Sequence, residues 1–209
     1  MSELSVRERS RRHMLGEITA IALRLFAERG YENVTVDEIA AEAGISSRTF
    51  FRYFATKDEV ITQFSRRLVE RLLDALAARP ESEGAVTALR NAYVETSAVA
   101  PANRKAVVQQ QSFMRSSRSL FASTLETQAS GQDDVAALLA THMGLRGVDT
   151  RCRTIAAAMN AVAGAAFQDW VESGGKGDPS ERVGSALDLL IHGLGALDMP
   201  AKTPRKASA

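Results

Sequence analysis

Two short amphipathic segments separated by a glycine, within residues 35–54, constrain the fold of this chain more than any other feature. Thr35 and Glu38 have the spacing of a capping box, in which each side chain accepts a hydrogen bond from the other residue's backbone N–H, so a helix is expected to begin there. Gly44 is expected to end that helix, and Ser46 is the expected N-cap of a second short helix. Two short helices joined by so tight a turn are typical of a helix-turn-helix unit.

Apolar side chains at helical spacing indicate how this unit packs. The preceding helix, over about residues 15–29, has one apolar stripe made of Ile18, Ala22, Leu25 and Phe26. In the second short helix, Phe50 and Phe54 are four residues apart and are expected to point inward. The opposite face of that helix is then free to enter a major groove of DNA.

The free face carries hydroxyl and guanidinium groups, which suit phosphates and base edges. The residues expected to contact DNA from this helix and its cap are Ser46, Ser47, Arg48, Thr49, Phe51, Arg52 and Tyr53. Arg48 is the candidate for a bidentate contact with guanine. The cap at Ser46 leaves nearby backbone N–H groups to meet a phosphate. Taken alone, these residues also fit a small helical subdomain with a solvated basic face.

Residues 23–61 read LRLFAERGYENVTVDEIAAEAGISSRTFFRYFATKDEVI, and this stretch resembles the DNA-binding domain of the TetR family of bacterial transcriptional regulators. The similarity runs without a gap over about residues 12–72, and its landmarks are Phe26, Gly30, Thr35, Ile39, Ala40, Gly44, Thr49, Phe54 and Lys57. It implies that Thr35 and Lys57 contact phosphates. Phe51 stands where the family usually has Tyr, which removes one hydroxyl, and Arg48 stands where Gly is frequent, which adds a base-reading group.

Four arginines precede the first helix and are expected to form a flexible basic arm over residues 1–12. They are Arg7, Arg9, Arg11 and Arg12, and of these Arg11 and Arg12 are expected to contact DNA. Such an arm enters a minor groove or lies along phosphates, and a solvated leader is the alternative. The formal net charge is only +1, so bulk charge does not attract nucleic acid and local placement must do so. The acidic residues expected to face away from DNA are Glu17, Glu28, Glu32 and Glu42.

The rest of the chain is also expected to be helical. Gly and Pro are sparse inside long stretches rich in Ala, Leu, Arg and Glu, and alternating β-branched runs are absent, so the fold class is all-α. A helix-turn-helix domain over residues 13–57 is followed by a ligand-binding and dimerisation domain over 58–198 and a disordered tail over 199–209. One helix from Lys57 to Arg79 joins the two domains. Further helices are expected at about residues 84–99, 102–128, 133–143, 149–173 and 178–197.

The last two helices are the predicted dimer interface, because one is rich in small residues that allow close approach and the other has an aliphatic stripe. The interface residues named from them are Ala161, Ala165, Val183, Leu187, Leu190, Ile191 and Leu194. The alternative is that both helices close the core of one chain.

A ligand cavity is predicted from aromatic and Met side chains, each of which also suits a plain core. They are Phe113, Met114, Phe121, Met143, Met159, Phe167 and Trp170. Residues 101–119 carry the basic side chains Arg104, Lys105, Arg115 and Arg118 without an acid, so the segment suits the anionic head of an acyl-CoA or is a solvated basic helix. The C-terminal half also resembles the actinobacterial branch of the family that includes the mycofactocin-system regulator, which implies an acyl-CoA ligand.

Other classes of function are set aside. The single cysteine, Cys152, excludes a disulfide framework and fits a reducing cytoplasm, and His13, His142 and His192 are too far apart in sequence to suggest a metal site. No catalytic grouping, cofactor or membrane span is expected. The function expected is a DNA-binding homodimer, a repressor released by a small apolar or amphipathic ligand. The alternative is a ligand-independent DNA-binding protein whose C-terminal domain docks a protein partner.

Overall fold

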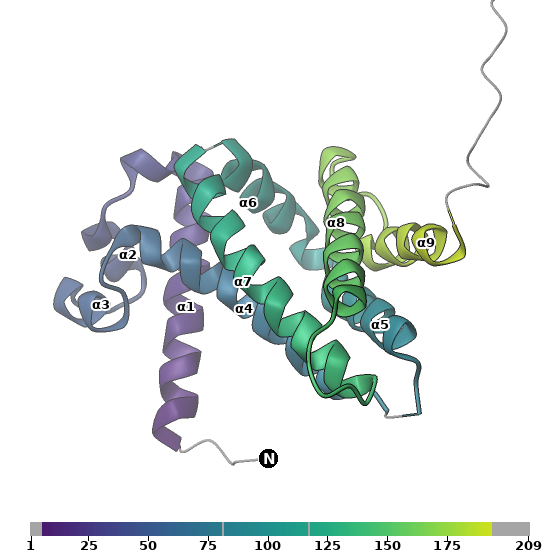
Figure 1. Ribbon diagram of the computed structural model, residues 1–209. Helices are drawn as coiled ribbons and strands as arrows, with labels where there is room; N and C mark the ends of the chain where they lie inside the picture. The colour runs from purple at the N-terminus through teal and green to yellow at the C-terminus, as the bar shows by residue number, and fades with distance from the viewer. Residues whose placement is uncertain (1–5, 81, 117, 194–209) are drawn as a thin grey trace, which may run out of the picture.

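The computed structural model describes residues 6–80, 82–116 and 118–193, and over these ranges the chain is helical without a strand, which confirms the all-α prediction (Figure 1). A head is formed by α1 (Val6–Arg29), the short 3-10 helix η1 (Tyr31–Asn33), α2 (Val36–Glu42) and α3 (Ser47–Tyr53). The body is formed by α4 (Lys57–Ala77), α5 (Ala85–Ser97), the 3-10 helix η2 (Pro101–Asn103), α6 (Arg104–Ser116), α7 (Arg118–His142), α8 (Thr150–Glu172) and α9 (Pro179–His192). None of the described helices has the length and apolar character needed to cross a membrane.

The two short helices of the head begin and end where their capping residues predict. Thr35 Oγ1 accepts a hydrogen bond from the backbone N–H of Glu38 at 3.2 Å, and Glu38 Oε2 accepts one from the N–H of Thr35 at 2.8 Å. Ser46 Oγ accepts from the N–H of Thr49 at 3.1 Å and so caps α3. Gly44 has φ +66, a left-handed conformation that glycine adopts without steric cost. These contacts confirm the helix-turn-helix geometry.

The buried apolar side chains form two clusters, one in the head and one in the body. The head cluster contains Phe26, Phe50 and Phe54 together with Val60 of α4 and Met114 of α6. The body cluster is built from α4, α5, α7, α8 and α9. Both α4 and α6 therefore connect the body to the core of the head, with α4 contributing to both clusters.

The boundary between the sixth and seventh helices differs from the prediction. A break was expected near residue 130, but α6 ends at Ser116 and α7 runs through Gly131 to His142. A Cβ built on Gly131 would lie 2.7 Å from Cγ1 of Val69 on α4. This glycine therefore permits α4 and α7 to approach closely, and the contact offsets the roughly 1 kcal/mol that glycine costs inside a helix.

The predicted N-terminal arm also differs from the structure. α1 begins at Val6, so residues 6–12 continue the helix, in keeping with the good helix propensity of arginine. Residues 1–5, the predicted tail over 199–209 and the interface residue Leu194 lie outside the described residues.

Candidate functional site

The outward face of α3 presents two guanidinium groups and a phenyl ring. Arg48, Phe51 and Arg52 are exposed, with 54% of Phe51 accessible to solvent. On the inner face, Phe50 and Phe54 are fully buried and their ring centroids lie 5.3 Å apart. The aromatic pair fixes α3 against the head, so the exposed face is held rigidly and can contact phosphates, base edges and thymine methyl groups.

The hydroxyl groups around α3 are engaged inside the head. Ser46 Oγ lies 3.0 Å from Thr49 Oγ1 and also caps the helix, while Ser47 Oγ donates to the carboxylate of Asp37 on α2. The half-buried ring of Tyr53 lies under the guanidinium of Arg52, 5.3 Å from its Cζ. These residues therefore set the position of α3, and their contact with DNA stays a prediction.

Lys57, expected to contact a phosphate, directs its ammonium group into the protein. Nζ donates to the carbonyl oxygens of Tyr31 at 2.7 Å and Val34 at 3.0 Å, and it lies 4.0 Å from the centroid of the Tyr31 ring. The Tyr31 hydroxyl donates to the carboxylate of Asp58, and burial followed by this contact raises the pKa of Tyr31. Lys57 is therefore a clamp between the first turn of α4 and the segment joining α1 to α2.

Replacing Lys57 with methionine keeps the aliphatic stem and removes both charged hydrogen bonds to the carbonyls. We expect the free energy of unfolding to fall by about 1–3 kcal/mol, measured by thermal or urea unfolding. Lys105→Met, at an exposed lysine of α6, is the matched control and should leave the stability unchanged. If Lys57→Met keeps full stability and lowers only the salt dependence of DNA binding, the clamp assignment is wrong and the phosphate role is correct.

Several acidic residues of the head are paired with basic ones. Arg24 of α1 forms ion pairs with Glu28 of the same helix at 3.6 Å and with Glu42 of α2 at 2.5 Å, and the orientation of these carboxylates away from DNA stays a prediction. His13 lies 3.3 Å from Glu17 along α1. Arg11 and Arg12, also on α1, are exposed, whereas the side chains of Arg7 and Arg9 lie outside the described residues.

Two of the residues expected to line a ligand cavity lie in the core of the head. The ring centroid of Phe113 is 6.1 Å from that of Phe26, and Met114 is 7% exposed within the same cluster. Phe113 and Met114 are therefore contacts between α6 and the head and not cavity residues.

The other described residues of the predicted cavity set lie in the body, and none of them lines either of the two hollows described below. Met143 and Met159 pack in the body core. Trp170 is fully buried, and its ring centroid lies 5.3 Å from that of Phe167. Its Nε1 donates to the carbonyl of Gly177 at 3.1 Å, which anchors the loop before α9. The side chain of Phe121 lies outside the described residues. Periodicity alone did not distinguish these core positions from a cavity lining.

A small cavity of about 30 Å³ lies between α4, α5, α7 and α8. It is lined by Val69, Leu72, Tyr93, Gly131, Gln132, Val135, Ala156 and Asn160. Its polar groups carry no charge: the Tyr93 hydroxyl donates to Oδ1 of Asn160 at 3.3 Å, and burial raises the pKa of Tyr93, so the phenol stays protonated. One turn before Val69, Ser65 is 4% exposed, and its hydroxyl has no hydrogen-bond partner within the described part of the chain. The cavity therefore combines apolar walls with neutral hydrogen-bonding groups.

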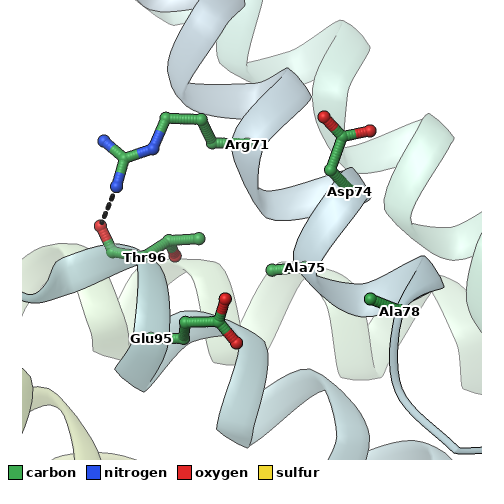
Figure 2. Close-up of a pocket in the computed structure, with 6 residues that line it drawn as sticks. All are labelled: Arg71, Asp74, Ala75, Ala78, Glu95 and Thr96. Carbon is green, nitrogen blue, oxygen red and sulfur yellow. Dashed lines mark hydrogen bonds between the residues drawn. The ribbon is translucent and has the colours of Figure 1, made fainter.

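A larger hollow of about 350 Å³ is an open groove between α4 and α5 (Figure 2). Its walls carry the carboxylates of Asp74 and Glu95, and Nη2 of Arg71 donates to the carbonyl of Thr96 at 3.3 Å. These charged walls do not suit an apolar ligand. No three His, Cys, Asp or Glu side chains among the described residues are close enough to hold a metal ion.

In the basic segment predicted to bind an anionic head group, Arg104 already has partners within the protein. Arg104 Nε donates to the carbonyl of Val99 at 3.3 Å, and its Nη2 lies 3.8 Å from the carboxylate of Asp178. Lys105 is exposed, and the side chains of Arg115 and Arg118 lie outside the described residues.

The helices predicted to form a dimer interface divide into buried and exposed residues. Val183 and Leu187 are fully buried in the body cluster, so they are core residues of one chain and not interface residues. Leu190 is half-buried and packs against the same cluster, whereas Ile191 is 39% exposed. The small residues exposed on α8 are Ala157, Ala161, Gly164 and Ala165, and Leu189 is also exposed on α9.

The chain is similar to known transcriptional regulators over most of its length. Residues 18–63 match the family model "Bacterial regulatory proteins, tetR family", and residues 83–195 match the model "MftR C-terminal domain". The chain is 30% identical over 187 residues to the putative mycofactocin biosynthesis transcriptional regulator MftR of Mycobacterium tuberculosis. This alignment covers 87% of this chain and 91% of that protein. It is 38% identical over 88 residues to the HTH-type transcriptional regulator TcmR of Streptomyces glaucescens, covering 42% of this chain and 39% of that protein.

Solved structures share the fold. The fatty acid degradation regulator FadR from Bacillus halodurans superimposes with a TM-score of 0.65 at 21% identity, over 87% of this chain and 96% of that one. FadR from Bacillus subtilis in complex with stearoyl-CoA superimposes with a TM-score of 0.56 at 18% identity, over 84% of this chain and 97% of that one.

Proposed function

The chain belongs to the TetR family of bacterial regulatory proteins, and on that premise we propose that it is a repressor that holds its operator with α3 until a small-molecule effector binds the body. The observation that carries this proposal is the outward face of α3. Arg48, Phe51 and Arg52 are exposed there, while Phe50 and Phe54 lock the opposite face. A cytoplasmic location follows, because the bacterial chromosome lies in the cytoplasm.

Two heads are needed to read a two-fold operator, so we infer a homodimer through the exposed face of α8 and α9. Small side chains along α8, such as Ala161 and Ala165, allow a partner helix to approach closely. The exposed aliphatic side chains of Leu189 and Ile191 add apolar area beside them. Burial of this face in a dimer would remove these side chains from water.

We place the effector in the cavity between α4, α5, α7 and α8. The related fold of FadR is described in complex with stearoyl-CoA in Bacillus subtilis and with lauroyl-CoA in Thermus thermophilus, so an acyl-CoA is the first ligand class to test. The cavity of about 30 Å³ has room for about one water molecule. A chain of methylene groups therefore enters only when α4 and α7 separate.

Separation of α4 and α7 would couple effector binding in the body to the position of the DNA-binding head. Val69 touches Gly131 where these helices meet, and the first turn of α4 packs in the head core through Val60. Met114 of α6 supplies a second contact with that core. An effector that holds α4 and α7 apart favours a position of the heads that no longer matches the operator. Its effect is limited by its differential affinity for the two conformations.

Replacing Tyr93 with phenylalanine tests the cavity. The change keeps the ring and removes the hydroxyl that bonds to Asn160, so we expect the effector concentration for half-release to rise by about 3- to 10-fold while DNA affinity without effector stays the same. Fluorescence anisotropy of labelled operator measures both quantities. Glu95→Gln in the α4–α5 groove is the control and should leave release unchanged. A change in release for Glu95→Gln, with none for Tyr93→Phe, would place the effector in the groove.

A ligand-independent DNA-binding protein whose body docks a protein partner is the second candidate, and the small size of the cavity favours it. The two candidates differ in thermal unfolding with acyl-CoAs. Ligand at 100 times its Kd stabilises the native state by about 2.7 kcal/mol, whereas a body that takes no ligand shows no shift in Tm.

A further inference from the structure

Arg67 of α4 hydrogen-bonds to the backbone of α1 near the N-terminal end of α1. Its Nη2 donates to the carbonyl oxygen of Arg12 at 2.6 Å. Its Nη1 lies 2.7 Å from the position that a Cβ on Gly16 would occupy. A helical Cα–Cβ bond leans toward the N-terminus, so the side chain at position i+4 partly covers the carbonyl at position i. Gly16 is four residues after Arg12, and its missing side chain opens that carbonyl to the guanidinium.

This contact lies where α1 leaves the core of the head. Ile18 is fully buried, and among the described side chains of α1, which begin at residue 10, Met14 and Leu15 are the first that pack against the head cluster. Before them, residues 10–13 are exposed, and Figure 1 shows this end of α1 extending clear of the other helices. The exposed turns carry Arg11 and Arg12. Arg67 therefore fixes a basic segment of α1 that makes no contact with the apolar core of the head over residues 10–13.

We propose that Arg67 is a positioning residue for DNA binding, which sets the N-terminal turns of α1 so that their arginines contact operator phosphates. This inference rests on the proposed repressor function. Arg67 also lies two residues before Val69, and Val69 lines the effector cavity. A shift of α4 on effector binding moves the grip on α1 together with the base of the head, so one displacement loosens both sets of DNA contacts.

Three single variants test the proposal. Arg67→Ala removes the hydrogen bond to Arg12. Gly16→Ala keeps every charge, favours the helix intrinsically, and displaces the guanidinium with its new Cβ. Arg66→Ala, at the exposed neighbouring position, removes the same charge without touching α1 and is the matched control. Binding of labelled operator is measured from 50 to 300 mM salt, and amide hydrogen exchange is measured over residues 8–14.

We expect the slope of log K against log salt to become shallower by about 2 per dimer in Arg67→Ala and in Gly16→Ala, since each lost phosphate contact lowers it by about 0.9 and both protomers lose one. The ratio of operator to random-DNA affinity should change little, because phosphate contacts carry no sequence information. Hydrogen exchange over residues 8–14 should become faster in Arg67→Ala; in Gly16→Ala the gain in helix propensity opposes the loss of the Arg67 contact, so the salt slope decides for that variant. Arg66→Ala should match the wild type in both measurements.

Wild-type slopes in both Arg67→Ala and Gly16→Ala would overturn the inference and leave the repressor function intact. An equal loss in Arg66→Ala would also overturn it, because the effect would then come from charge alone. A wild-type protein without preference for operator at any salt concentration would instead remove the proposed function and this inference together.

Discussion

Arg48→Ala is expected to lower the preference for operator over a base-substituted operator by about 5- to 150-fold per guanine contact, the equivalent of about 1–3 kcal/mol. The effect is specific because the Arg48 side chain is exposed and has no ion pair within the described part of the chain. Removing it leaves the Phe50–Phe54 anchor in place, so α3 keeps its position. Competition between the two DNA duplexes, followed by anisotropy, measures the preference directly.

Arg52→Ala is the matched control for this prediction. Arg52 lies on the same exposed face but over the ring of Tyr53, near the end of α3. We expect this variant to weaken binding to both duplexes by the same factor, as loss of a phosphate contact does. If both variants lose the same preference, Arg48 has no special role in reading the bases.

Ala161→Arg is expected to convert the protein into monomers and to lower operator affinity by about 10²- to 10⁴-fold, because two heads that no longer share a dimer lose their effective concentration. Ala161 is exposed on α8, so the longer side chain has room in one chain. Between two closely packed copies of α8 and α9 it places an unpaired charge and excess volume. Light scattering measures the mass, and anisotropy measures the affinity.

Ala77→Arg, at an exposed alanine near the end of α4, controls for the added charge and should remain dimeric. Circular dichroism should show the same helix content in both variants. Ala161 is a cleaner position than Leu190, whose half-buried side chain also packs against the body core. A dimer of unchanged mass for Ala161→Arg would show that the interface lies on another face.

Local signals predicted the head well because they act within one turn of helix. Thr35 and Ser46 cap their helices by accepting hydrogen bonds from the N–H three positions on, and Asp178 caps α9 by accepting from the N–H of Ser180, two positions on, at 3.0 Å. The break between α6 and α7 was misplaced because Gly131 has a tertiary role. Its close contact is with Val69, far away in sequence.

Long-range packing explains why the sequence named Lys57 and Met114 but assigned them other roles, and why Tyr93 and Asn160 were missed. Lys57 meets the carbonyls of Tyr31 and Val34, which periodicity cannot predict. Met114 has helical spacing that fits a cavity, a body core or the head core equally well, and only the packing of α6 against α1 decides among them. Asn160 gave one usable sign, because it interrupts the nearly apolar stretch 155–167. Its hydrogen bond with Tyr93 explains why a polar residue is accommodated there.

The most direct test of ligand-released repression is a titration of the purified protein against its own upstream intergenic DNA at physiological salt, with random DNA as competitor and with a panel of acyl-CoAs. We expect a Kd of about 10⁻⁸ M or tighter that persists in a large excess of competitor, as in specific complexes, and we expect one ligand class to release the DNA. Binding that random DNA removes completely, with no recovery in any ligand, would contradict ligand-released repression.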